Sequence, residues 1–178
     1  GVITTDNRQW AEWMHSYKHF GMATPADRGQ GPFTRLGTNY KLSNVNAAIG
    51  LCQMREIDTL LQRRRCLAER YLQAFAGCDG IDIPSRLPDA KPSYQSCCIL
   101  VERRDDKLQK LRQAGIEAQI GTYALHLQRA FQNTQVCRLA GHLTGSKEAF
   151  DKCLCLPLYH EMTTDQQDRV VDAVQALD

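Results

Sequence analysis

Apolar side chains recur at helical spacing near the start of the chain. They form a single stripe, which predicts a helix that is capped by Asp6 and ends near His19, just before Gly21. A stretch rich in glycine and proline follows from residue 22 to 38 and predicts a long loop. The apolar members of the stripe are Trp10, Trp13, Met14 and Tyr17.

A second helical stripe is longer. Ser43 is a suitable N-cap, and no glycine or proline interrupts the pattern between Gly50 and Gly77. The pattern predicts one helix over residues 43–77, about 50 Å long at 1.5 Å per residue, that links two domains or subunits. The arginines at 63–65 are expected on its solvated face rather than in a phosphate site. The apolar members are Val45, Ile49, Cys52, Leu60, Leu67, Tyr71 and Phe75.

Shorter elements alternate after residue 78. Thr164 and Gln167 form the pattern of a capping box before the last helix. The alternation predicts an α/β fold in which a small, largely antiparallel sheet carries helices on one face. The predicted strands are 81–83, 95–102, 116–120 and 154–156, and the predicted helices are 105–114, 125–131, 146–153 and 164–177. The expected divisions of the chain are 1–42, 43–77 and 78–178.

Composition narrows the class of protein. Of the 178 residues, 43% are hydrophobic and 24% are charged, with a formal net charge of +2, so the chain is expected to fold and shows no sign of binding nucleic acid or a membrane surface. No apolar run is long enough to span a membrane. The eight cysteines form no CxxC pair, and we expect buried, reduced thiols, no metal site and a cytoplasmic location.

The residues from 36 to 43 carry the clearest local chemistry. Asn39 and Lys41 lie in a loop that contains glycine, directly before a predicted helix N-terminus. The amide of Asn39, the ammonium of Lys41 and the free N–H groups of the helix end can all donate hydrogen bonds to an anion such as phosphate. A simple turn that caps the helix explains the same residues equally well. Of the scattered histidines, His19 and His126 lie next to segments of functional character, and a structural role remains open for each.

Several segments together resemble the DegT/DnrJ/EryC1/StrS family, whose members are PLP-dependent sugar aminotransferases of fold type I. The most specific segment is 36–50, in which Asn-Tyr-Lys-Leu-Ser runs into Ala-Ala-Ile-Gly. The resemblance covers nearly the whole chain. The other matching segments, in order, are 1–6, 19–22, 63–65, 115–117, 123–126 and 156–158.

The resemblance implies that the chain is the C-terminal portion of such an enzyme. Residues 1–42 would end the large PLP-binding domain, 43–77 would be the linking helix and 78–178 the small C-terminal domain. Family members transfer an amino group, usually from glutamate, to a keto group on a nucleotide-linked sugar. The lysine that forms the Schiff base with PLP is expected upstream of this sequence, so no catalytic residue is assigned here and the chain is expected to be inactive alone.

The resemblance also suggests binding residues. Asn39 matches the asparagine that reaches the phosphate of the neighbouring subunit's PLP, which implies at least a homodimer with a composite site. Lys41 stands where arginine is common and is assigned to the cofactor as well. Tyr123 and His126 match a segment that lines the nucleotide-sugar end of the cleft, and His19 is also assigned to the substrate.

One alternative remains at this stage. The chain could be a stand-alone binding or dimerisation module, or a regulatory module, derived from an aminotransferase domain. An upstream domain that carries the lysine would distinguish the enzyme from such a module.

Overall fold

The computed structural model describes residues 1–23, 31–132 and 137–177. The chain forms two compact units, Gly1–Glu56 and Ile57–Asp178. The boundary falls inside the single helix predicted for 43–77, which is two helices in the structure: α2 (Asn44–Arg55) and α3 (Ile57–Phe75). The backbone dihedral angles of Glu56, φ −101° and ψ 5°, lie outside the α-helical range. The N–H of Glu56 donates to the carbonyl of Gln53, three residues earlier, so α2 ends in a tight turn.

The first unit contains α1 (Arg8–Tyr17) and α2. Asn7, not Asp6, caps α1, because its side chain accepts a hydrogen bond from the backbone N–H of Trp10. Ser43 caps α2 as predicted, accepting from the N–H of Asn46 at 3.3 Å. In this structure α2 buries none of its residues.

The second unit contains a four-stranded sheet. Its strands are β1 (Ile81–Asp82), β2 (Cys97–Val101), β3 (Gln119–Ile120) and β4 (Cys153–Leu156), in the spatial order β1-β2-β4-β3. All three strand pairs are antiparallel, which confirms the predicted small antiparallel sheet. Strands β1, β2 and β3 are shorter than predicted, whereas β4 begins one residue earlier than predicted, at Cys153.

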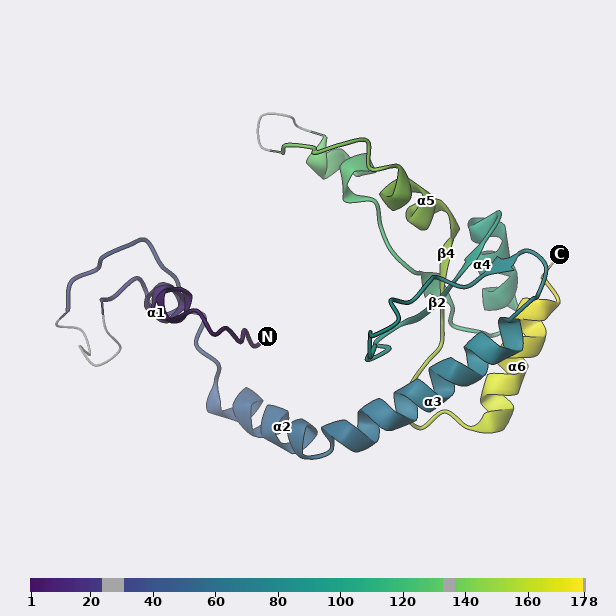
Figure 1. The fold of residues 1–178 in the computed structure, drawn as a ribbon, viewed down its shortest axis with the longest axis horizontal. Coiled ribbons are helices and arrows are strands. Elements are labelled where there is room, and N and C mark those ends of the chain that lie inside the picture. The colour runs from purple at the N-terminus through teal and green to yellow at the C-terminus, as the bar shows by residue number, and fades with distance from the viewer. Residues whose placement is uncertain (24–30, 133–136, 178) are drawn as a thin grey trace. The chain divides into compact units, whose positions relative to one another are not determined.

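The helices of this unit follow the predicted order. They are α3, α4 (Arg104–Gln113), α5 (Thr144–Lys152) and α6 (Thr164–Gln175), with two short 3₁₀ helices, η1 (Leu125–Leu127) and η2 (Arg129–Phe131). The capping box of α6 is Thr163 with Gln166, one residue earlier than predicted. Helices α3 and α6 run side by side (Figure 1).

One hydrophobic core holds the second unit together. Alternate residues of β2 and β4, among them Ile99 and Leu154, face the same side of the sheet and are fully buried. Tyr71 and Phe75 of α3 stack with ring centroids 6.0 Å apart, and apolar residues of α4 and α6 complete the cluster. The burial of this apolar face therefore explains why the sheet packs against α3, α4 and α6.

Two of the three arginines at 63–65 form hydrogen bonds to the backbone of another segment, which the sequence did not predict. The guanidinium of Arg64 donates to the carbonyls of Tyr94 and Gln95 at 2.8 and 2.7 Å, and that of Arg65 donates to the carbonyl of Pro92 at 3.0 Å. The expectation of a solvated face is therefore wrong for these two side chains. They fasten the proline-rich segment before β2 to α3.

Candidate functional sites

The first candidate site forms where the loop after residue 31 returns to the end of α1. The N–H of Thr38 donates to the carbonyl of Tyr17 at 2.9 Å, and the N–H of Tyr40 donates to the carbonyl of Lys18 at 3.1 Å. His19 and Asn39 are antiparallel bridge partners. This short backbone pairing fixes Asn39 beside the helix end, although the two residues are 20 positions apart.

Two glycines make the close approach possible. Gly21 has a φ of +82°, and a Cβ built there would lie 1.9 Å from the carbonyl oxygen of Arg35. A Cβ on Gly37 would lie 2.3 Å from the backbone nitrogen of Gly21 and 2.7 Å from the carbonyl oxygen of Tyr17. Any side chain at either position would push the loop away from α1.

The side chains that result form a cluster of hydrogen-bond donors. The Nζ of Lys41 lies 3.3 Å from Nδ1 of His19 and 4.6 Å from the ring centroid of Phe20. The Oδ1 of Asn39 accepts the N–H of Lys41 at 3.3 Å, which leaves its amide NH₂ group to donate elsewhere. No acidic side chain among the described residues forms an ion pair with Lys41.

This donor cluster suits an anion. An amide NH₂ and an ammonium group, with an imidazole beside them, match the acceptor oxygens of a phosphate. Asn39 and Lys41 are exposed and His19 is partly exposed, so a ligand can reach them. The structure thus brings together all three residues that the sequence analysis assigned in the first unit.

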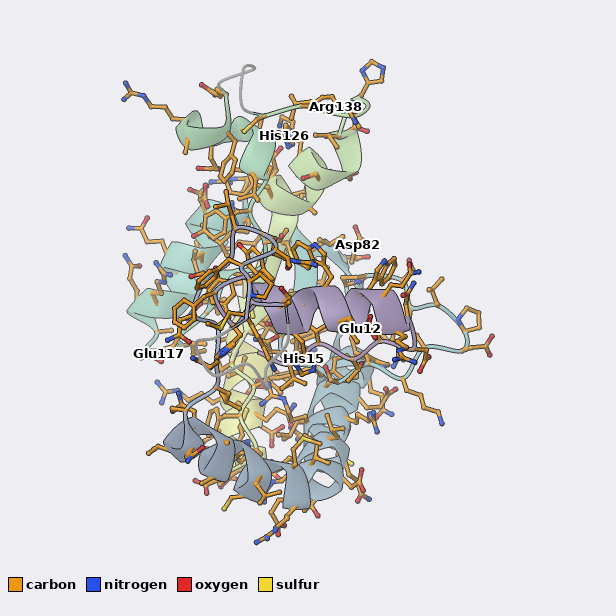
Figure 2. The ribbon with its side chains drawn as sticks, turned by 90° about the vertical axis from the view of Figure 1, so that its left-hand side faces the viewer. Glu12, His15, Asp82, Glu117, His126 and Arg138 are labelled. Atoms are coloured by element: carbon orange, nitrogen blue, oxygen red, sulfur yellow. The ribbon has the colours of Figure 1, made fainter. Side chains whose placement is uncertain are left out.

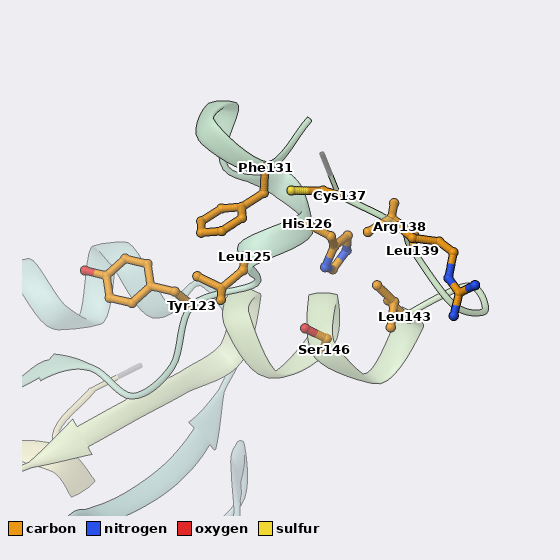
Figure 3. A pocket seen from close by; sticks show the side chains of 9 residues that line it. All are labelled: Tyr123, Leu125, His126, Phe131, Cys137, Arg138, Leu139, Leu143 and Ser146. Carbon is orange, nitrogen blue, oxygen red and sulfur yellow. The ribbon is translucent and has the colours of Figure 1, made fainter. Parts of the chain in front are cut away.

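The second candidate site is a pocket of about 520 Å³ in the second unit. Tyr123 and His126 both line it, and His126 and Arg138 lie together at one end of the unit (Figure 2). Figure 3 shows the imidazole of His126 in the middle of the pocket, with the guanidinium of Arg138 pointing away from it. The remaining lining residues are Leu125, Phe131, Cys137, Leu139, Leu143 and Ser146.

The sequence analysis missed most of this pocket. Cys137 and Arg138 follow the predicted helix of 125–131 in a stretch with no periodicity, so no pattern marks them as lining residues. Leu143 and Ser146 come from the start of α5. The pocket and the donor cluster belong to different units.

Other classes of site find no support in the part of the chain that the structure describes. No group of three or more His, Cys, Asp or Glu side chains there is arranged to hold a metal ion. None of the helices described is both long and apolar enough to cross a membrane.

The chain belongs to the DegT/DnrJ/EryC1/StrS aminotransferase family, whose profile matches residues 1–175. Among solved structures, it is similar to DesV of S. venezuelae, with 26% identity over 97% of this chain and a TM-score of 0.83, and to the aminotransferase TlmJ of Streptoalloteichus hindustanus, with 28% identity over 96% and a TM-score of 0.80. PseC of Helicobacter pylori shares the fold, with 20% identity over 96% and a TM-score of 0.81.

The same comparisons define how much of these proteins the chain represents. It covers 45% of the DesV and TlmJ chains and 46% of the PseC chain. The fold is therefore that of the C-terminal portion of a fold type I aminotransferase, as the sequence indicated.

The approach of Gly37 to α1 gives a direct test of the first site. We expect Gly37→Ala to lower the free energy of unfolding of the first unit by about 1–3 kcal/mol, because the new methyl group overlaps backbone atoms. Both tryptophans of the chain lie on α1, so their fluorescence during urea unfolding reports on this unit alone.

Gly50→Ala is the matched control. Gly50 lies in α2 with nothing within 4 Å of an added Cβ, so alanine is expected to be neutral or to stabilise the helix by about 0.5–1 kcal/mol. Equal unfolding midpoints for the two variants would show that the Gly37 contact does not hold the loop.

Proposed function

We propose that this chain forms the C-terminal part of a PLP-dependent enzyme that transfers an amino group from glutamate to a keto group on a nucleotide-linked sugar. Membership in the aminotransferase family supports the reaction class. The observation that carries the cofactor assignment is the donor cluster of Asn39, Lys41 and His19. Because these 178 residues cover less than half of the similar chains, the activity is assigned to the larger fold.

PLP would be held at the donor cluster through its phosphate. The amide NH₂ of Asn39 and the ammonium of Lys41 would donate to the phosphate oxygens. His19, which the sequence assigned to the substrate, would instead keep Lys41 in position through its Nδ1 contact. When bound, PLP supplies the electron sink for moving the amino group. The part of this chain is to orient the cofactor, and its acid–base chemistry is assigned to a lysine outside these residues.

The proposed active site is composite and needs a homodimer. Asn39 would serve the PLP of the neighbouring subunit, and its exposure is consistent with a ligand that lies beyond its own unit. Exposed apolar residues of the first unit support the homodimer, because large apolar side chains that are exposed in one chain mark a surface that a partner covers. Leu36 and Tyr40 are 95% and 70% exposed.

The pocket around His126 would bind the sugar-nucleotide substrate. It combines an imidazole, a tyrosine ring and a largely apolar wall, a mixture that suits a ligand with both a flat base and polar groups. Its volume falls within the range of small-molecule sites. A cytoplasmic location is proposed with it, and the eight free cysteines support a reducing compartment.

The first prediction concerns the chain by itself. Incubated with PLP and glutamate, the 178-residue chain is expected to show no conversion of glutamate to 2-oxoglutarate, because the lysine that acts on the cofactor is not among its residues. Coupled detection of 2-oxoglutarate measures this. Turnover by the purified chain would place the catalytic lysine within this sequence and overturn the assignment.

The second prediction concerns Asn39 in the full-length protein. Asn39→Ala is expected to weaken PLP binding by about tenfold, the loss of one hydrogen bond to a charged group. Fluorescence titration of the apoprotein with PLP measures the dissociation constant. Asn46→Ala, which removes an exposed asparagine of α2, is the matched control and should bind PLP normally.

Mixed dimers test whether Asn39 acts across the subunit boundary. A subunit that carries Asn39→Ala is mixed with one that lacks the catalytic lysine, each inactive or weak alone. In a composite dimer, one of the two sites regains both groups, so activity should rise on mixing. Unchanged activity after demonstrated exchange of subunits would assign Asn39 to its own subunit.

The third prediction concerns His126. In the full-length enzyme, His126→Ala is expected to raise the KM for the sugar nucleotide about tenfold while the KM for glutamate stays unchanged, because the pocket contacts only the larger substrate. Steady-state kinetics with each substrate varied separately measures both. His160→Ala removes an exposed histidine that does not line the pocket and serves as control; equal effects on both KM values would contradict the assignment.

A further inference from the structure

Three cysteines occupy the face of the sheet that turns away from the hydrophobic core. Cys98 on β2 is the direct cross-strand partner of Cys155 on β4, and Cys153 lies two residues before Cys155 on the same face. Cys98 and Cys155 are partly exposed, whereas Cys153 is buried. Neither candidate site described above uses these thiols.

Two of these sulfur atoms, those of Cys153 and Cys98, converge beside Gly121. A Cβ built on this glycine would lie 2.3 Å from Sγ of Cys153 and 3.1 Å from Sγ of Cys98, so both sulfurs point at the same spot. Cys98 is also the strand partner of Cys155, so it lies next to both of the other cysteines. The glycine leaves the space that the sulfurs of Cys153 and Cys98 occupy.

The surroundings favour a thiolate at Cys155. Its pKa is lowered to about 6, chiefly by the hydrogen bond from Cys98 and further by hydrogen bonds from the Ser96 side chain and the backbone of Cys97. The hydrogen bond from Cys98 also lowers the pKa of Cys153. Partly exposed thiols of this kind are the ones that react with oxidants.

A buried cation adds to the polarity of this region. The side chain of Arg104 is 3% exposed, and its Nη1 lies 3.4 Å from the carbonyl oxygen of Cys153. The guanidinium pairs with Asp105 at 2.8 Å and lies over the ring of Phe150. Its positive charge further favours the ionised form of Cys153.

We propose that Cys98 and Cys155 form a redox site that reduces hydroperoxides and closes as a disulfide between β2 and β4. The thiolate sulfur of Cys155 attacks the terminal oxygen of the hydroperoxide and the O–O bond breaks, which forms a sulfenic acid. An alkoxide leaves, or hydroxide where the substrate is hydrogen peroxide, and takes up a proton from water. The sulfur of Cys98 then attacks the sulfur of Cys155, the S–O bond breaks, and water leaves as the disulfide forms. The peroxide gains two electrons, and a dithiol reductant returns them to the cysteines.

The strand register allows this bond. Directly opposed residues of an antiparallel pair have Cα atoms about 4.5–5.5 Å apart, which falls within the Cα separation of disulfides. The inference does not depend on the proposed aminotransferase activity. Loss of one activity would therefore leave the other intact.

The test treats the reduced full-length protein with hydrogen peroxide, alkylates the remaining thiols and digests it with trypsin without reduction. The expected product joins peptide 87–103 to peptide 153–169, with fragment ions that place the link at Cys98 and Cys155. The protein itself loses about 2 Da, the mass of two hydrogens. A link through Cys153, or no link while other cysteines oxidise, would overturn the proposal.

Three variants separate the roles. Cys98→Ser is expected to abolish the link and to leave Cys155 as a sulfenic acid that dimedone traps, and Cys155→Ser should abolish both products. Cys52→Ser removes an exposed cysteine of α2 and should form the link normally. Circular dichroism checks that each variant is folded. If a substitution unfolds the sheet, the wild-type protein provides the test, through the rates at which Cys155 and Cys52 are alkylated at pH 6.5. We expect Cys155 to react at least ten times faster than Cys52. Equal rates would contradict the proposal of a reactive thiolate at Cys155.

Discussion

The close backbone approach between the end of α1 and the returning loop is the constraint on which the first site depends. Two glycines, Gly21 and Gly37, meet where neither can carry a side chain. The hydrogen bonds from Thr38 and Tyr40 to the last residues of α1 follow from that contact. Without it, Asn39 would not stand next to His19, and the donors would not converge.

The two units are stabilised by different kinds of interaction. The second unit buries a continuous core in which Ile99, Leu154 and Tyr71 are fully removed from solvent. The first unit relies instead on backbone hydrogen bonds, on stacking of Trp13 with Tyr17 at 5.0 Å and on the guanidinium of Arg35 above Trp13. A region held in this way contributes little hydrophobic stabilisation of its own, because apolar burial is the main favourable term in folding.

Much of the fold could be predicted from the sequence because local signals carry it. Alternation and turn residues located the short antiparallel sheet, and Ser43 marked the start of α2 correctly. The interruption at Glu56 could not be predicted, because neither glycine nor proline lies there and the apolar spacing continues across it. The two capping errors, at Asn7 and Thr163, arose because two residues that can cap stand next to each other in each place.

The candidate sites could be predicted only in part, because residues in a recognisable local segment are visible in the sequence and contacts between distant segments are not. Asn39 and Lys41 stood in a recognisable segment, and His19 was singled out on its own, yet only the backbone pairing brings the three together. In the pocket, Tyr123 and His126 were identified, but Arg138 came from a stretch without any pattern. The thiols of Cys98 and Cys155 lie 57 positions apart and meet only through the strand register, which no local pattern encodes.

A glycine makes room for a close contact at two of the places where function is inferred. Gly37 lets a loop lie against α1, and Gly121 leaves room for two sulfurs while its N–H donates to the carbonyl of Cys153 at 2.9 Å. Gly121 also begins the segment that leads to Tyr123 and His126. The thiol cluster and the pocket are thus neighbours along the chain, because Gly121, which lies beside the sulfurs, stands two residues before Tyr123 and five before His126.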